Sequence, residues 1–232
     1  MMDIIRSDSR GSADHGWLKS QHTFSFADYH NPARMGFGSL RVINEDYIEP
    51  GKGFGTHPHR DMEIITYVID GALEHKDNMG NGSVIRPGDV QRMTAGTGVS
   101  HSEYNHSSED RVHLLQIWIQ PEKNGIQPGY EQKFFAPDEK RNRWRLVGSR
   151  DGRGNSLTIH QDVDLYASLL EKGRALEHRF GGRRLGFLHV VAGAVNSDGE
   201  RLAAGDALAI SDQATLTLRA TQDSELLLFD MA

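Results

Sequence analysis

Two histidines separated by one residue, His57 and His59, are the first residues whose types and spacing suit a chemical site. They follow a glycine-rich stretch over residues 51–55 and precede an apolar run over residues 64–69 that is typical of a strand. In an extended chain, side chains two positions apart point to the same face and lie roughly 6–7 Å apart. A neutral imidazole nitrogen binds a metal ion without bringing a buried charge. The pair therefore predicts a metal site that needs further ligands from elsewhere in the chain.

His101 and Glu103 repeat this spacing. On a facing strand, they would complete a set of three imidazole nitrogens and one carboxylate. Such a set suits Fe, Mn, Co, Ni, Cu or Zn, and the residue types alone do not choose among them. Four protein ligands on a six-coordinate ion leave two positions open, whereas a closed tetrahedral zinc site is the structural alternative. Glu63 competes with Glu103 for the role of carboxylate ligand, because it shares the strand parity of His57 and His59.

The composition excludes several classes of protein. The 232 residues include 26 Lys and Arg against 32 Asp and Glu, without the basic block of a nucleic-acid-binding protein. The absence of cysteine excludes disulfides, thiolate metal sites and cysteine nucleophiles. Neither a signal peptide nor a run near the ~20 apolar residues of a membrane span is visible. We therefore expect a cytoplasmic protein that binds no membrane and makes no direct contact with nucleic acid.

Short apolar runs separated by glycine-rich turns predict an all-β chain. We expect an N-terminal metal-binding domain over residues 1–125, a linker over 126–142 and a C-terminal domain over 143–232. Gly205-Asp206-Ala207 echoes Gly88-Asp89-Val90, which indicates two diverged copies of one barrel. Residues 163–170 alternate like a strand, although a short helix over 162–173 competes with that interpretation. The main expected strands cover residues 40–48, 63–69, 72–75, 83–85, 112–119, 144–147, 157–159, 163–170, 185–191, 207–210, 216–218 and 226–229.

Two motifs carry a specific resemblance. The spacing Gly51-x5-His57-x-His59-x3-Glu63-x7-Gly71 resembles the first cupin motif, with its last interval one residue longer. Gly98-x2-His101-x3-Asn105 resembles the end of the second cupin motif, with Gly96 in place of the usual proline. Within the cupins the chain is most similar to the pirin family, close to the bacterial pirin-like quercetin 2,3-dioxygenases. The pirin-like signatures lie at residues 15–17, 22–26, 55–63 and 95–105.

This resemblance implies a bicupin fold of two antiparallel β-barrel, or jelly-roll, domains. It implies a metal ion in the N-terminal domain, held by His57, His59, His101 and Glu103, and it assigns no ligand role to Glu63. One divalent transition metal per chain is expected, with Fe(II) first and Mn, Co, Ni, Cu or Zn as alternatives. Glu103 is also the expected catalytic residue, as the acceptor of a substrate hydroxyl proton.

The implied activity is that of a quercetin 2,3-dioxygenase, which opens a flavonol ring with O2 and releases carbon monoxide. The expected partners are a flavonol and O2, and we expect a monomer. The alternative is a pirin-like metal-binding regulatory protein that modulates a partner protein and turns over flavonols only incidentally. A sugar-phosphate isomerase or a storage cupin is a third, weaker hypothesis.

The remaining histidines lack the paired spacing. We expect His75 and His106 to face solvent and His113 to be a packed structural residue. His15, His22 and His30 are expected to be surface or hydrogen-bonded structural histidines. Because His160, His178 and His189 show neither His-x-His nor His-x-Glu, the C-terminal domain is expected to carry no metal. Phe54 and Trp118 either line a pocket for an aromatic ligand or pack in the core.

Overall fold

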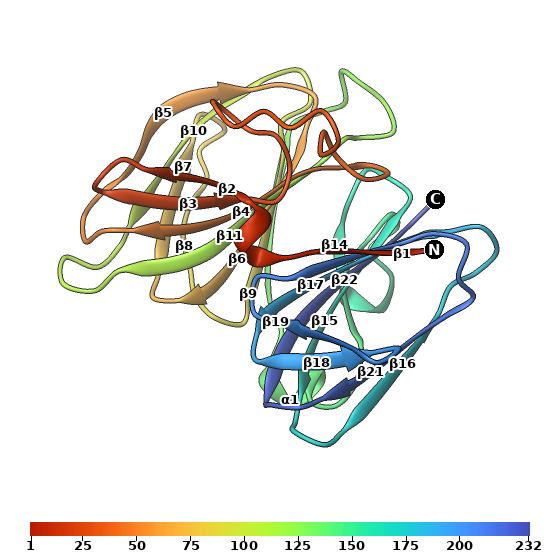
Figure 1. The fold of residues 1–232 in the computed structure, drawn as a ribbon. Coiled ribbons are helices and arrows are strands. Elements are labelled where there is room, and N and C mark those ends of the chain that lie inside the picture. Colours follow the sequence, from red (N-terminus) through yellow and green to blue (C-terminus); the bar gives the residue numbers. More distant parts are fainter. The chain divides into compact units, whose positions relative to one another are not determined.

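The computed structural model describes all 232 residues, and its regular secondary structure consists almost entirely of strands (Figure 1). The single α-helix, α1 (Pro137–Lys140), has four residues. Neighbouring strands run antiparallel in both halves of the chain, which confirms the all-β prediction. No helix has the length and apolar composition that crossing a membrane requires.

The chain forms two compact units, and neither is one continuous segment. The N-terminal unit comprises Gly11–Phe134 and Leu157–Gln161, and the C-terminal unit comprises Met1–Arg10, Phe135–Ser156 and Asp162–Ala232. Residues Met1–Arg10 belong to the C-terminal unit because β1 (Met2–Ile5) pairs along its whole length with β20 (Ala207–Ile210). In Figure 1 the red N-terminal strand accordingly lies among the blue strands. The boundaries expected at residues 125 and 142 stay a prediction.

Two sheets make up the N-terminal unit. The larger has the strand order β12-β9-β6-β11-β4-β3-β2, and the smaller has the order β5-β10-β7-β8. The edge strand β12 lies within the expected linker over residues 126–142. It pairs with β9, so this part of the expected linker is the edge of a sheet. The strands of this unit are β2 (Gly11–Asp14), β3 (Leu18–His22), β4 (Leu40–Ile48), β5 (Gly53–His59), β6 (Glu63–Asp70), β7 (Leu73–Asp77), β8 (Gly82–Ile85), β9 (Asp89–Thr94), β10 (Val99–Asn105), β11 (Val112–Ile119), β12 (Gly129–Phe134) and β14 (Leu157–Thr158).

A hydrophobic core lies between these two sheets. Ile48 and Leu114 of the larger sheet belong to the same buried cluster as Leu73 and Ile85 of the smaller sheet. Burying one such side chain stabilises the fold by about 1.5–3 kcal/mol. Further along the same inner face, Gln116 lies opposite both Asn44 and Thr66. A row of polar side chains therefore interrupts the apolar inner face of the larger sheet.

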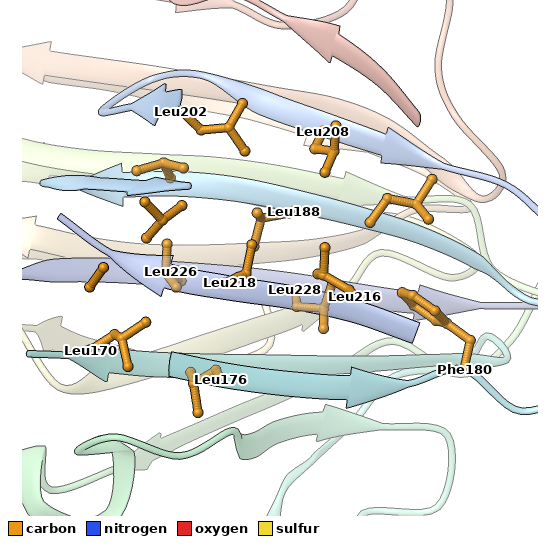
Figure 2. Close-up of a cluster of buried hydrophobic side chains, with 14 residues drawn as sticks. Leu170, Leu176, Phe180, Leu188, Leu202, Leu208, Leu216, Leu218, Leu226 and Leu228 are labelled. Atoms are coloured by element: carbon orange, nitrogen blue, oxygen red, sulfur yellow. The ribbon is translucent and has the colours of Figure 1, made fainter. Parts of the chain in front are cut away.

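The C-terminal unit is built in the same way. Its larger sheet contains the strand order β1-β20-β17-β22-β15-β13, and its smaller sheet has the order β16-β21-β18-β19. Leucine side chains from both sheets meet in its core (Figure 2). The further strands of this unit are β13 (Arg145–Ser149), β15 (Val163–Leu170), β16 (Ala175–Arg179), β17 (Leu185–Ala192), β18 (Ala194–Ser197), β19 (Glu200–Ala203), β21 (Thr215–Ala220) and β22 (Ser224–Met231).

The ambiguity over residues 162–173 is resolved in favour of a strand. β15 pairs with β22 along its whole length, from Val163 opposite Met231 to Leu170 opposite Ser224. Alternate residues of β15, from Val163 through Leu165 to Ala167, are buried. Non-local pairing with β22 on one side and with β13 on the other supplies the backbone hydrogen bonds that a helix would make internally, which explains why no helix forms.

Candidate functional site

Pairing between β5 and β10 brings three histidines together. His101 of β10 lies directly opposite His57 of β5, and His59 is two residues further along β5. The ring centroid of His57 is 4.4 Å from that of His101 and 4.8 Å from that of His59. The centroids of His59 and His101 are 4.9 Å apart. The three histidines therefore form one cluster on neighbouring strands of the smaller sheet, and Glu103 is not part of that cluster.

The nitrogen atoms of these rings suit a metal ion. One ligand nitrogen from each of His57, His59 and His101 lies within 4.8 Å of the others. The Nδ1 atom of His57 is 2.8 Å from the carbonyl oxygen of Gly55, so this nitrogen carries the proton and Nε2 keeps its lone pair. The Nε2 atom of His101 is buried and has no hydrogen-bond partner. A buried nitrogen without a partner is costly unless it serves another role, and ligation of a metal is such a role.

The rings are also held in the form that binds metals. Burial, with a smaller contribution from the neighbouring His57, lowers the pKa of His59 to about 4. Burial is likewise the largest cause that lowers the pKa of His101, to about 3, and the surrounding histidines add to it. Both imidazoles are therefore neutral at pH 7, as a metal ligand must be.

Glu103 lies two residues beyond His101, after an irregularity in the pairing of β10 with β5. Its carboxylate is buried and accepts hydrogen bonds from Nε2 of Gln116, 2.7 Å from each oxygen, and from Oγ1 of Thr66 at 3.4 Å. Burial raises the pKa of Glu103 to about 7, against the effect of these hydrogen bonds. Gly53 permits the close approach of β5, since a Cβ atom there would lie 2.1 Å from the carbonyl oxygen of Glu103.

Glu63 points elsewhere. Residues 60–62 separate β5 from β6, and Asp61 between them has φ 50°, so strand parity is not carried from His59 to Glu63. Oε2 of the buried Glu63 accepts hydrogen bonds from both the backbone N–H and the ring Nδ1 of His160, each at 3.1 Å. His160 therefore has a structural role that its isolated position in the sequence did not indicate.

His75 contradicts the expectation that it faces solvent. Its side chain is fully buried, because it lies opposite Glu103 in the pairing of β7 with β10. Nδ1 of His75 is 3.4 Å from Nδ1 of His101, and Nε2 is 3.3 Å from Oδ2 of Asp77. Burial lowers the pKa of His75 despite the opposing effect of Asp77, so its imidazole is neutral. His75 also forms a second ligand-type group with His101 and Glu103. Only the non-local pairing of β7 with β10 reveals this residue.

The three histidines and Glu103 open onto a cavity of about 570 Å³. Trp118 and Phe54 both line it, so they are cavity residues as well as packed aromatics. Trp118 stands edge-on against His59, with 5.0 Å between ring centroids, and Phe26 stands edge-on against Trp118 at 5.5 Å. Phe26 comes from the irregular segment after β3. Sequence patterns did not assign this segment to the site, although its cluster of histidines and aromatics was the available signal.

A second polar group lines the same cavity, on β3 and β4. Nδ1 of His22 is 2.9 Å from Oδ1 of Asn44, and the hydroxyl of Ser20 donates to Asp46. All four side chains are buried and line the cavity. His22 is thus hydrogen-bonded as expected, but it also faces the cavity.

Asp46→Asn is expected to stabilise the metal-free protein above pH 7. Burial raises the pKa of Asp46 from 3.8 to about 6, although the hydrogen bond from Ser20 opposes it. Between these two values the folded state holds a proton that the unfolded state releases. The free energy of unfolding therefore falls as the pH rises through this window and stays lower above it, by up to about 3 kcal/mol. Asparagine keeps an oxygen for Ser20 and carries no charge.

Urea unfolding of the metal-free protein at pH 4 and pH 8 measures this difference. We expect a higher midpoint for the variant at pH 8 and nearly equal midpoints at pH 4. An identical pH dependence for the variant and the parent chain would contradict the assignment of this cost to Asp46.

The other histidines of the N-terminal unit lie outside the three-histidine cluster. His113 hydrogen-bonds through Nε2 to Oε1 of Glu45 at 2.9 Å and stacks on Tyr47, as expected of a packed structural histidine. His106 is partly exposed beside Glu74. Both ligand-type groups that the chain contains lie in the N-terminal unit.

Comparisons with known proteins agree with this geometry. The sequence model of the family described as Pirin matches residues 5–119, and the model described as "Quercetinase C-terminal cupin domain" matches residues 146–231. The quercetin 2,3-dioxygenase of Escherichia coli (strain K12) is 50% identical over 231 residues, which cover 100% of this chain and 99% of that protein. The pirin-like protein of Caulobacter vibrioides is 42% identical over 233 residues, with 100% of each chain covered.

A solved structure gives the same result in three dimensions. The crystal structure of the bacterial pirin YhhW from Escherichia coli in complex with nickel(II) matches with a TM-score of 0.95 and 50% identity. The match covers 100% of this chain and 99% of that one. Similarity over the whole length confirms the predicted bicupin fold.

Proposed function

The chain belongs to the pirin family, and from this premise we propose that it is a metal-dependent dioxygenase that opens a flavonol ring with O2. One observation carries the proposal. Three imidazoles, one with a buried Nε2 lacking any partner, meet at an aromatic-walled cavity of about 570 Å³. This volume falls within the range of about 300–1,000 Å³ that is typical of small-molecule sites. The E. coli relative that bears the name quercetin 2,3-dioxygenase gives the substrate class.

In this proposal His57, His59, His101 and Glu103 hold one divalent transition metal. Three imidazole nitrogens and a carboxylate suit Fe(II), which we favour, and Mn, Co, Ni, Cu or Zn are the alternatives. Nickel(II) is the ion in the structure of the E. coli pirin. When bound, the metal would act as a Lewis acid and hold the substrate beside O2.

Glu103 is the proposed catalytic base. A flavonol carries a hydroxyl group beside a carbonyl group, and this hydroxyl must lose its proton before ring opening. Glu103 lines the cavity, and the hydrogen bonds from Gln116 and Thr66 fix the direction of its carboxylate. A carboxylate held in place within hydrogen-bond reach of a substrate hydroxyl can accept the proton directly.

The walls of the cavity suit a flat aromatic substrate. Phe26, Phe54 and Trp118 offer apolar ring faces and edges beside the histidines. Ser20 and Asp46 line the same cavity, where they can bind further hydroxyl groups of the substrate. A polyhydroxylated flavonol meets both requirements.

Metal loading tests the proposed function. Metal-free protein is loaded separately with Fe(II), Mn, Co, Ni, Cu and Zn, and O2 uptake and carbon monoxide release are followed with quercetin. We expect metal-dependent turnover in which one carbon monoxide is released for each O2 consumed. No turnover with any of the six metals would contradict the proposal, and stoichiometric capture of one partner protein by that same preparation would favour a regulatory role.

A further inference from the structure

A buried chain of polar groups runs from His101 to an aspartate away from the cavity. In the pairing of β7 with β10, Glu103 lies opposite His75, and His101 lies opposite Asp77. Nδ1 of His101 meets Nδ1 of His75 at 3.4 Å, and Nε2 of His75 meets Oδ2 of Asp77 at 3.3 Å. The side chains of His75 and Asp77 are fully buried, so water does not compete for these contacts.

Asp77 is fixed as an anion. Its Oδ1 accepts the backbone N–H groups of Met79 and Asn81, each at 2.9 Å, and its Oδ2 accepts Nδ2 of Asn81 at 2.8 Å. Burial raises the pKa of Asp77, but the hydrogen bonds from Asn81, His75 and Met79 outweigh burial and hold it below the ordinary value. An ionised carboxylate accepts hydrogen bonds and donates none.

The positions of the protons on His75 and His101 follow from the ionised state of Asp77. Since Asp77 only accepts, Nε2 of His75 carries the proton. A neutral imidazole has one donor nitrogen and one acceptor nitrogen, so Nδ1 of His75 accepts. Nδ1 of His101 must then be the donor, which leaves the lone pair of His101 on Nε2. This is the buried nitrogen without a partner.

We propose that Asp77 and His75 are positioning residues that fix the tautomer and orientation of His101, so that its Nε2 is always ready to bind the metal ion. This inference rests on the proposed function only in that His101 is a metal ligand. The outer nitrogen of a metal-binding histidine usually donates to a carboxylate, a backbone carbonyl or water. In this chain the carboxylate acts one residue further away, through a second imidazole.

Asp77→Asn is the sharpest test, because it reverses the direction of the two hydrogen bonds that link residue 77 to His75 and His75 to His101. The backbone N–H groups of Met79 and Asn81 retain the amide oxygen at the position of Oδ1, so the amide nitrogen faces His75. The side-chain amide of Asn81 turns to present its oxygen to this nitrogen. His75 then accepts at Nε2 and donates at Nδ1, and His101 accepts at Nδ1 and carries its proton on Nε2. We expect nickel(II) affinity, measured by competition with a chelator, to fall about 10- to 100-fold.

The metal-free protein gives a readout that a general loss of stability would not reproduce. Long-range ¹H–¹⁵N spectra of ¹⁵N-histidine-labelled protein should place the His101 proton on Nδ1 in the parent chain and on Nε2 in Asp77→Asn. Glu74→Gln is the matched control, since it removes the same charge from the same strand. Glu74 is on the outer side beside Lys76 and His106, so neither the spectra nor the nickel affinity should change.

A second variant keeps the test decisive if Asp77→Asn folds poorly. His75→Phe retains an aromatic ring against Tyr130, whose ring centroid is 5.0 Å from that of His75, but it cannot accept the proton of His101. We expect both tautomers of His101 and weaker nickel binding. An unchanged His101 tautomer in either folded variant, or full nickel affinity in both, would overturn the inference. Absence of flavonol turnover in the parent chain bears on the proposed function alone, because tautomer and nickel affinity are measured separately.

Discussion

His101→Ala is expected to remove both bound metal and flavonol consumption. The variant deletes the nitrogen that is buried without a partner and breaks the cluster that His101 forms with His57 and His59. Removing a residue that hydrogen-bonds a metal ligand typically lowers metal affinity about 10- to 100-fold. Removing the ligand itself should therefore lower metal affinity by at least about 100-fold. Elemental analysis of the purified variant and O2 uptake with quercetin measure the two losses.

His113→Ala is the matched control for this experiment. His113 belongs to the same unit, is hydrogen-bonded to Glu45 and is absent from both ligand-type groups. We expect it to keep its metal and its activity, although the lost contact with Glu45 lowers stability slightly. Full O2 uptake by metal-free His101→Ala would refute metal-dependent oxygenation, and thermal melting of both variants shows whether either loss reflects unfolding.

Glu103→Gln is expected to separate substrate activation from metal binding. Glutamine has the shape of glutamate but cannot accept the hydroxyl proton of the substrate. Because a positioned general base contributes about 10²- to 10⁴-fold, kcat/KM should fall by a factor in this range while some metal stays bound to the three histidines. Stopped-flow measurement of flavonol consumption at saturating metal gives the rate.

The comparison variant is Glu45→Gln. Like Glu103→Gln it neutralises a buried glutamate, but Glu45 lies on β4 of the larger sheet. Glu45 pairs with His113 and does not line the cavity, so its replacement should leave kcat/KM unchanged. Equal rates for Glu103→Gln and the parent chain, at equal metal content, would assign the proton transfer to another group.

Spacing indicated that His57 and His59 share one strand face and that His101 and Glu103 could face them, and the pairing of β5 with β10 brings His101 to the first two histidines. The reason is physical, since side chains two apart share a face of any strand, and two such pairs converge when their strands are neighbours. The same rule failed for Glu63, because the turn at Asp61 resets the parity between β5 and β6. It also gave no sign of His75, whose burial depends on a strand partner about 28 residues further along the chain.

The residues that line the cavity were equally hard to predict from the sequence. Polar residues such as Ser20 and Asp46 are indistinguishable in sequence from solvent-facing positions of a strand, and only the closing of one sheet over the other buries them. The strand at residues 163–170 was predictable as an alternating pattern, but β22 was needed to exclude a helix. Metal identity, a protein partner, a monomeric state and the expected cellular location stay predictions.

The exchange of short segments between the two units determines when each can finish folding during synthesis. Met2–Ile5 is made about two hundred residues before its partner strand Ala207–Ile210. The carboxylate of Glu63 likewise gains its hydrogen bonds from His160 only when a segment almost one hundred residues later has been made. A nascent chain therefore carries the strand Met2–Ile5 unpaired and Glu63 without its hydrogen-bond partner until those later segments have been made. Cutting the gene between the two halves would leave both fragments in that incomplete state.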